Sequence, residues 1–177
     1  MAVAEIAEAG QYLTFQLNEE VFSVDISKVR EVLEFTTITK VPRMPEYIRG
    51  AINLRDSVVP VIDLRIKFGM AMTEKTINTC IIIVEVDVGG GIASGERNKM
   101  VTGVLVDAVQ EVMDIESKDI EPAPGIGIGL KTEFIKGMGK HGDHFIIILD
   151  IDKVFSSMDI LGIQGTGGVE SSEDTEV

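Results

Sequence analysis

Apolar and polar residues alternate with a period of two through most of the chain, a pattern typical of half-buried β-strands. The first such stretch covers residues 13–17, where Leu, Phe and Leu share one face. The polar residues 18–20 follow, and the alternation resumes over 22–26. This pattern predicts a β-hairpin near the N-terminus.

The residues after this hairpin change to a helical period. Asp25 is placed to cap a short helix whose apolar positions are Ile26, Val29 and Val32 or Leu33. A short helical turn is therefore expected here.

A second hairpin is predicted over residues 51–64. Its strands are 51–54 and 58–64, and its turn is Arg55-Asp56-Ser57. Pro60 lies inside the returning strand, which indicates a sheet edge or a bulge at that residue. Before this hairpin, Pro42 and Pro45 bracket an extended, non-helical segment.

Four more strands are predicted: 79–87, its partner 100–107, 109–115 and 145–151. The glycine-rich residues 89–99 read as a surface loop. We expect one mostly β domain over 11–160, with short helices, a flexible N-terminus at 1–10 and a disordered acidic tail at 163–177.

An internal repeat organises this pattern. Residues 48–68 align with 135–155 without gaps at an offset of 87, and 29–35 align with 109–115 at an offset of 80. The two alignments keep the same order along the chain. They predict two similar β units that share a core.

Composition and charge narrow the function classes. The net charge is −13, with 16 basic and 29 acidic residues, which argues against binding to a nucleic-acid backbone. Residues 28–67 hold eight bases and five acids, a local basic region suited to an acidic protein partner or simply a mixed solvated surface. No secretory signal or membrane-spanning stretch is recognisable, so an intracellular protein is expected.

The catalytic inventory is thin. His141 and His144 flank a predicted turn and are expected to be solvated, while Cys80 lies in an apolar strand and is expected to be buried. Asp63 and Asp150 are equivalent in the repeat, which favours helix capping over a catalytic carboxylate pair. We therefore expect no enzymatic activity, no cofactor and no metal.

Residues 125–129 alternate glycine with isoleucine, Leu130 follows, and the segment lacks the spacing of a nucleotide-binding loop. Ile126 and Ile128 either form an exposed apolar contact or close the end of a barrel.

The segment IRGAINLRDSVVPVIDLRIKFG (48–69) resembles the central motif of the CheW family, the coupling proteins of chemotaxis. The matching positions are Gly50, Asn53, Leu54, Arg55, Pro60, Val61, Asp63, Leu64, Arg65, Phe68 and Gly69. The first hairpin, the two-proline segment, GVLVDAVQEV and IEPAP extend the resemblance over about residues 11–155.

This resemblance implies a CheW-like fold of two SH3-like five-stranded β-barrel subdomains around a shared hydrophobic core. It also implies a non-enzymatic adaptor between the cytoplasmic tips of chemoreceptors and the regulatory domain of the histidine kinase CheA. The protein would then be cytoplasmic and recruited to membrane-associated receptor arrays, without inserting into the membrane. Further copies of itself in array rings would be a third partner.

By the same resemblance, Val29 and Glu31 match a receptor-facing helix and Arg55 matches a functional arginine. Glu121, Ile126 and Ile128 match a contact with the kinase or with another copy in the ring. From the residues alone, Val29 could be ordinary core, Arg55 a solvated turn residue and Glu31 the partner of Lys28 or Arg30.

Asp56 departs from the family, which usually has glycine there. We expect its carboxylate to lie beside Arg55 and partly neutralise it. Two other functions stay open: an adaptor in a chemosensory pathway with a non-flagellar output, and a small-molecule-binding β-barrel or an enzyme of unknown type, which would need a pocket of converging titratable groups.

Overall fold

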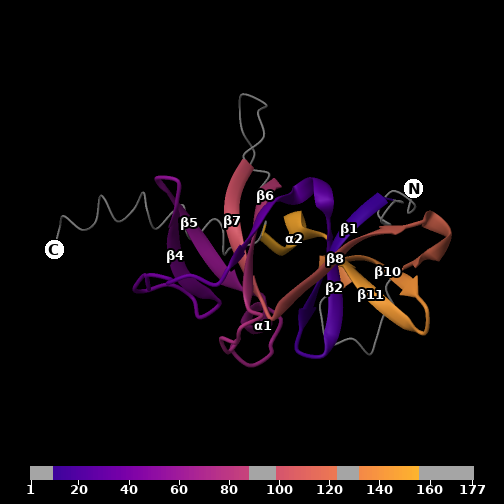
Figure 1. The fold of residues 1–177 in the computed structure, drawn as a ribbon, viewed down its shortest axis with the longest axis horizontal. Coiled ribbons are helices and arrows are strands. Elements are labelled where there is room, and N and C mark those ends of the chain that lie inside the picture. Colours follow the sequence, from indigo (N-terminus) through magenta and orange to yellow (C-terminus); the bar gives the residue numbers. More distant parts are fainter. Residues whose placement is uncertain (1–9, 88–98, 123–131, 156–177) are drawn as a thin grey trace.

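The computed structural model describes residues 10–87, 99–122 and 132–155. These residues form strands in two sheets, with short helical segments at the connections (Figure 1). The elements are β1 (Gly10–Leu17), β2 (Glu20–Asp25), η2 (Ile26–Lys28), β3 (Val29–Glu34), β4 (Ile48–Leu54), β5 (Ser57–Asp63), α1 (Leu64–Lys67), β6 (Cys80–Asp87), β7 (Lys99–Val106), β8 (Ala108–Ile115), η3 (Ser117–Asp119), β9 (Ile120–Glu121), η4 (Thr132–Phe134), β10 (Ile135–His141), β11 (His144–Leu149) and α2 (Ile151–Phe155).

The two sheets repeat one topology. The first has the order β8-β1-β2-β11-β10-β9 and the second β3-β6-β7-β5-β4. In each, an edge strand pairs with a hairpin, and the hairpin's second strand pairs in parallel with the next hairpin: β2 with β11, and β7 with β5. The predicted repeat thus corresponds to β3 with β8 and to β4–β5 with β10–β11.

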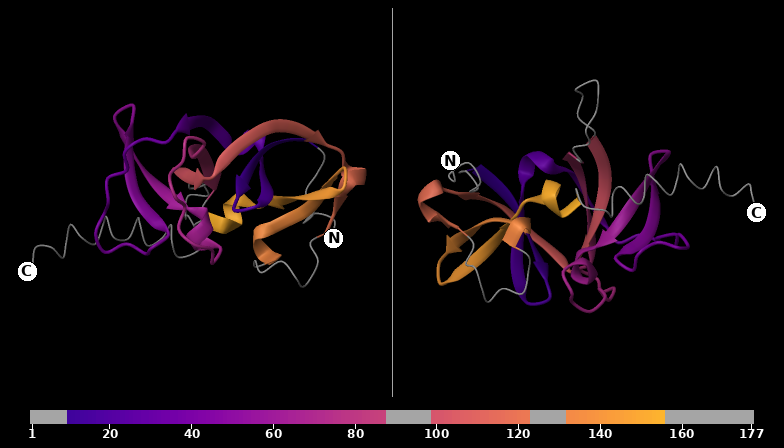
Figure 2. Two further views of the ribbon diagram at one scale, coloured as in Figure 1. Left: turned by 60° about the horizontal axis from the view of Figure 1, so that its bottom comes forward. Right: turned by 180° about the vertical axis from the view of Figure 1, so that it is seen from behind.

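The chain crosses between the sheets twice, so the second sheet is one continuous stretch of the sequence and the first sheet is assembled from both ends of it. β1 and β2 join the first sheet with strands from the C-terminal part, and β3 to β7 make the second sheet. Figure 2 shows the two sheets next to each other from two further directions, with α2 between them. Asp107 is the residue between β7 of one sheet and β8 of the other.

The main core is shared by both sheets. Its buried cluster includes Phe15 and Phe22 from the first sheet, Ile62 and Val84 from the second, and Phe155 from α2. Four rings form a ladder through it: Phe15–Phe22 at 6.1 Å between centroids, Phe22–Phe68 at 5.9 Å and Phe68–Phe134 at 6.1 Å. This common cluster explains how two small sheets obtain one adequate core.

The predicted hairpins are confirmed, and so is a helical turn capped by Asp25, but the helical spacing expected from Val29 onward is wrong. Asp25 does cap a helical turn by accepting a hydrogen bond from Ser27 N at 2.9 Å, but η2 ends at Lys28. Residues 29–34 form β3, which pairs with β6 and alternates half-buried with exposed side chains. Val29 and Val32 are β-branched and favour a strand once a partner is available.

Pro60 lies in β5, which is an interior strand. The parallel pairing of β5 with β7 begins at Val61, so at Pro60 only β4 is paired. The missing N–H therefore falls where the strand is locally an edge, and the bulge in this hairpin lies at Ile48–Gly50 instead.

Cys80 is half-buried at the start of β6, and not fully buried as predicted. The predicted loop at 89–99 lies almost wholly outside the described residues, and the predicted terminal segments 1–10 and 163–177 lie outside them apart from Gly10. No helix among the described residues is long and apolar enough to cross a membrane.

Candidate functional site

Arg55 and Glu31 form a bidentate ion pair between the β4–β5 turn and β3. Arg55 donates from two guanidinium nitrogens to the two carboxylate oxygens of Glu31, at 2.6 and 3.0 Å. The residues are 24 positions apart in sequence. Both residues were predicted as separate candidates, and the structure brings them together.

The turn that carries Arg55 has an uncommon backbone. Arg55 and Asp56 have φ angles of 50° and 70°, the left-handed values that a type I′ hairpin turn requires at both central positions. Asp56 N donates to Asn53 Oδ1 at 3.1 Å, which braces the turn. Asp is among the few non-glycine residues that tolerate this region, so the hairpin forms despite the missing glycine.

The expected pairing of Asp56 with Arg55 does not occur, because Glu31 accepts hydrogen bonds from both terminal nitrogens of the guanidinium group, Nη1 and Nη2. The other partners considered for Glu31 are also occupied elsewhere. Lys28 pairs with Asp152 at 2.7 Å, and Arg30 pairs with Glu85 at 3.2 Å.

The pair shifts the titration of both groups. The hydrogen bonds from Arg55 lower the pKa of Glu31 below its ordinary value, loss of hydration acts the other way, and the charges of Arg55 and Arg30 add to the lowering. The same bonds raise the pKa of Arg55. Glu31 therefore stays ionised to a lower pH than an ordinary glutamate.

A groove of about 700 Å³ opens beside the pair, and Glu31 and Arg55 belong to its lining. Its walls come from β3, the β4–β5 hairpin, β6 and β7. The apolar part includes Val58, whose side chain is 76% exposed, and Met100. Lys99 adds a positive charge at the rim, so the groove combines apolar surface with mostly basic edges. We name it the β3 groove.

Val29 takes a different position from Glu31. It is half-buried and packs against the main core cluster, outside the lining of the β3 groove. Val29 is therefore a core residue, and its packing holds the start of β3 in place.

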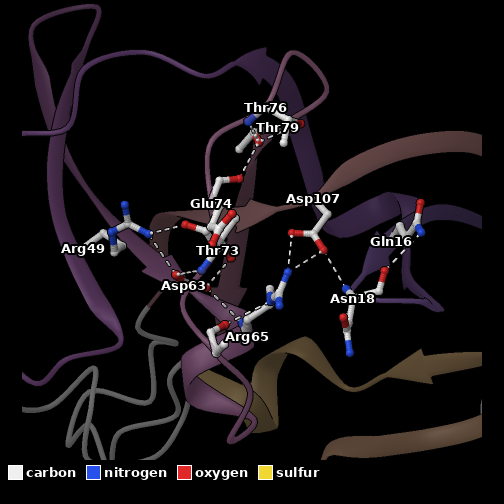
Figure 3. Close-up of polar contacts among 11 residues, drawn as sticks. Gln16, Asn18, Arg49, Asp63, Arg65, Thr73, Glu74, Thr76, Thr79 and Asp107 are labelled. Carbon is white, nitrogen blue, oxygen red and sulfur yellow. Dashed lines mark hydrogen bonds and ion pairs between the residues drawn. The ribbon is translucent and has the colours of Figure 1, made fainter.

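A buried network anchors the β4–β5 hairpin (Figure 3). The Asp63 carboxylate is fully buried and accepts hydrogen bonds from Thr73 N and Oγ1, from Arg65 N, and from Arg49 at 3.0 Å. The prediction that Asp63 caps the following helix is confirmed, but the sequence did not indicate its bonds to Arg49 and Thr73. Arg65 in this helix also donates a hydrogen bond to Asp107, at 3.1 Å.

Asp107 links the two sheets. It also accepts a hydrogen bond from Asn18 N in the β1–β2 turn, so one carboxylate contacts the first sheet and α1 at the point where the chain crosses (Figure 3). Polar contacts thus connect α1, which follows the β4–β5 hairpin, to the other sheet.

The candidates in the C-terminal part are only partly visible. Glu121 lies at the end of β9, exposed, and pairs with Lys140 at 3.4 Å. Ile126 and Ile128 lie outside the described residues. The structure does not bring Glu121 near the Arg55–Glu31 pair in any contact of the described residues.

The residues with catalytic side chains do not gather into a site. His141 and His144 are register partners next to the β10–β11 turn, both exposed. Within residues 10–87, 99–122 and 132–155, no three His, Cys, Asp or Glu side chains are grouped to hold a metal ion. The β3 groove also includes Val58, Lys99 and Met100, which the sequence did not indicate. These residues come together only through the pairing of strands that are distant in the sequence.

Comparison with known proteins gives one consistent result. The family model described as CheW-like domain matches residues 11–159. The chemotaxis protein CheW of Klebsiella aerogenes is 35% identical over 147 residues, covering 83% of this chain and 82% of that protein. The CheW of Treponema pallidum is 31% identical over 154 residues, covering 86% of each. The crystal structure of the scaffolding protein TtCheW from Thermoanaerobacter tengcongensis superposes with a TM-score of 0.71 at 36% identity, covering 86% of this chain and 92% of that one.

Proposed function

The chain belongs to the CheW-like domain family, and on that premise we propose that it couples chemoreceptors to the histidine kinase CheA as an adaptor without catalytic activity. Its role as a coupling protein in chemotaxis signalling rests on similarity to chemotaxis CheW proteins over most of both chains. The finer assignment of partners and residues is our proposal.

The observation that carries the residue assignment is the Arg55–Glu31 pair at the edge of the β3 groove. An apolar groove with charged edges suits the apolar face of a helical partner such as a receptor tip. The pair also joins the hairpin turn to the edge strand, so a partner that contacts one element will disturb the other. We propose Val29, Glu31 and Arg55 as the receptor-binding residues, with Val29 acting through the position of β3.

We propose Glu121, Ile126 and Ile128 as a contact with the kinase regulatory domain or with another copy in an array ring. The support is the resemblance of residues 121–128 to the family segment that makes these contacts, together with the exposed position of Glu121 at the end of β9. The proposed working location is the receptor array at the inner face of the membrane.

The first test is calorimetric titration against the C-terminal regulatory domain of the organism's CheA. Saturable 1:1 binding with a Kd in about the micromolar range is the expected result. Receptor-coupled kinase assays then compare Arg55→Asp with Lys118→Asp, which makes the same charge change at an exposed residue of η3. We expect Arg55→Asp to uncouple receptor control while Lys118→Asp behaves like the wild type.

Loss of binding by a folded wild-type protein would reject the adaptor proposal. Normal coupling by Arg55→Asp would reject only the residue assignment. A metabolite panel in a thermal-shift assay covers the small-molecule alternative, and the neighbouring genes or cognate receptors distinguish a flagellar from a non-flagellar output.

A further inference from the structure

A second groove lies around the two-proline segment, away from the residues assigned above. Its volume is about 590 Å³, and its lining comes from the connection between β3 and β4, from Ile66 of α1 and from Met72. The floor is apolar, with Phe35, Ile38 and Met44, and Met72 is 54% exposed at the rim. We name it the proline-segment groove.

The charges of this groove are mostly positive and uncompensated. Lys40 and Arg43 line it, and among the described residues neither has a carboxylate partner. Lys75 Nζ lies 5.1 Å from the centroid of the Phe35 ring, likewise with no carboxylate partner in the described part of the chain. Among the lining residues that the structure describes, Glu46 carries the only carboxylate, and Arg49 is paired with Asp63. Within the described part of the chain, two lining cations and Lys75 beside the groove thus lack a carboxylate partner, on a protein whose net charge is −13.

The groove is held in shape before any ligand arrives. Thr39 exchanges two backbone hydrogen bonds with Ala51, at 2.9 and 2.8 Å. Arg43 has a φ of 64°, which fixes a sharp bend between the prolines. On the other wall, Thr73 is bonded to buried Asp63, which fixes the loop that carries Met72. A preformed site loses little conformational entropy on binding.

Residues 156–177 of the same chain have the complementary chemistry. They contain five acids (Asp159, Glu170, Glu173, Asp174 and Glu176) and no base, and four of the acids fall within 170–176 next to Val169. The 13 residues between Phe155 and Val169 can extend over about 45 Å at most, because each residue adds roughly 3.3–3.6 Å. That is about three times the radius of gyration of about 15 Å expected for a domain of this size, so the groove is within reach.

We propose that the acidic segment 169–176 binds the proline-segment groove of its own chain, with its carboxylates facing Lys40, Arg43 and Lys75. The contact is intramolecular, so an effective concentration in about the millimolar range compensates for a weak intrinsic affinity. It covers the groove by charge attraction, and a partner that uses this face must displace it. This contact is independent of the adaptor proposal.

The test uses the full-length chain and paramagnetic relaxation in NMR. A nitroxide is attached at Ile77→Cys in a Cys80→Ser background; Ile77 is 99% exposed, lies outside the groove lining and is two residues from Lys75. The matched control carries the label at Val112→Cys, 46% exposed on β8 of the other sheet. We expect the amide signals of 169–176 to lose intensity with the label at 77 and to keep it with the label at 112.

The charge dependence completes the test. Lys40→Glu/Arg43→Glu should abolish the intensity loss, and so should raising NaCl from about 0.1 M to about 1 M, which shortens the Debye length from about 10 Å to about 3 Å. Equal loss from both labels, no loss from either, or loss that survives charge reversal each overturns the proposal. Loss seen when nitroxide-labelled protein is mixed with isotope-labelled protein places the segment of a second copy in the groove and overturns the intramolecular contact.

Discussion

At the scale of single residues, the Arg55–Glu31 pair depends on a strained turn. The pair is bidentate, but the Arg55 side chain is 73% exposed, so solvent screens the attraction between the two charges. The pair therefore orients the Arg55 side chain more than it stabilises the fold. Two left-handed residues in succession direct Arg55 toward Glu31 at the edge of the β3 groove. The turn thus determines where the Arg55 side chain lies, and it adds little to the strength of the ion pair.

The pair predicts a pH dependence with a defined sign. Because Arg55 lowers the pKa of Glu31, the pair stabilises the fold above the ordinary carboxyl pKa of about 4.3, and this contribution is lost as the pH falls through the lowered value. In Arg55→Leu the pKa of Glu31 should rise toward its ordinary value. NMR titration of the Glu31 carboxyl in both proteins measures this, and equal values in the two would contradict the pair in solution.

Asp56→Gly should stabilise the protein slightly. Glycine removes the left-handed strain at φ 70° but adds conformational entropy to the unfolded chain, so we expect a net gain of about 0.5 kcal/mol. Urea unfolding measures it. The matched variant Asp87→Gly, in the β6 strand, should instead lose stability. Since Asp56 does not neutralise Arg55, receptor coupling by Asp56→Gly should match that of the wild type.

At the scale of elements, hairpins were predictable and the partners of strands were not. The period-two pattern located β1–β2 and β4–β5 because each hairpin encodes its own register in its turn. Residues 29–34 fit a helical spacing equally well, and only the long-range pairing with β6 decides for a strand. The Arg55–Glu31 pair follows from that same pairing, so the residues were predictable singly but their contact was not.

The two repeat-equivalent aspartates should differ in their contribution to stability. Asp150 is half-buried and accepts a bond from Lys153 N at 3.2 Å, so Asp150→Ala should cost about 1 kcal/mol as a lost helix cap. Asp63→Ala removes the partner of Arg49 and Thr73 from a fully buried position and should cost about 3–5 kcal/mol. Urea unfolding of both variants gives the comparison, and equal costs would show that the buried network adds nothing beyond capping.

At the scale of the whole molecule, the shared core makes two similar sheets into one folding unit. The chain crosses between sheets after β2 and again at Asp107, and the four-ring ladder includes residues of β1, β2 and η4 together with Phe68 after α1. The repeat predicted the likeness of the sheets. It could not predict that β1 and β2 complete the sheet of the C-terminal strands, because a local pattern carries no information on which distant strands pair.

This common core predicts a single unfolding transition, and the sequence supplies one probe for each sheet. The chain has two tyrosines and no tryptophan: Tyr12 lies in β1, and Tyr47 precedes β4, where its carbonyl accepts from Asp63 N. Tyr12→Phe and Tyr47→Phe therefore each leave a fluorescent reporter in one half. Both should report the same midpoint in urea as circular dichroism.

Phe68→Ala should lower both midpoints together, at a cost of about 3–5 kcal/mol, because its ring contacts Phe22 and Phe134. Val58→Ala, at an exposed position, should change stability by less than about 0.5 kcal/mol. Two separate midpoints, or a Phe68→Ala effect confined to one reporter, would mean that each sheet unfolds independently and that the β3 groove does not depend on the other half.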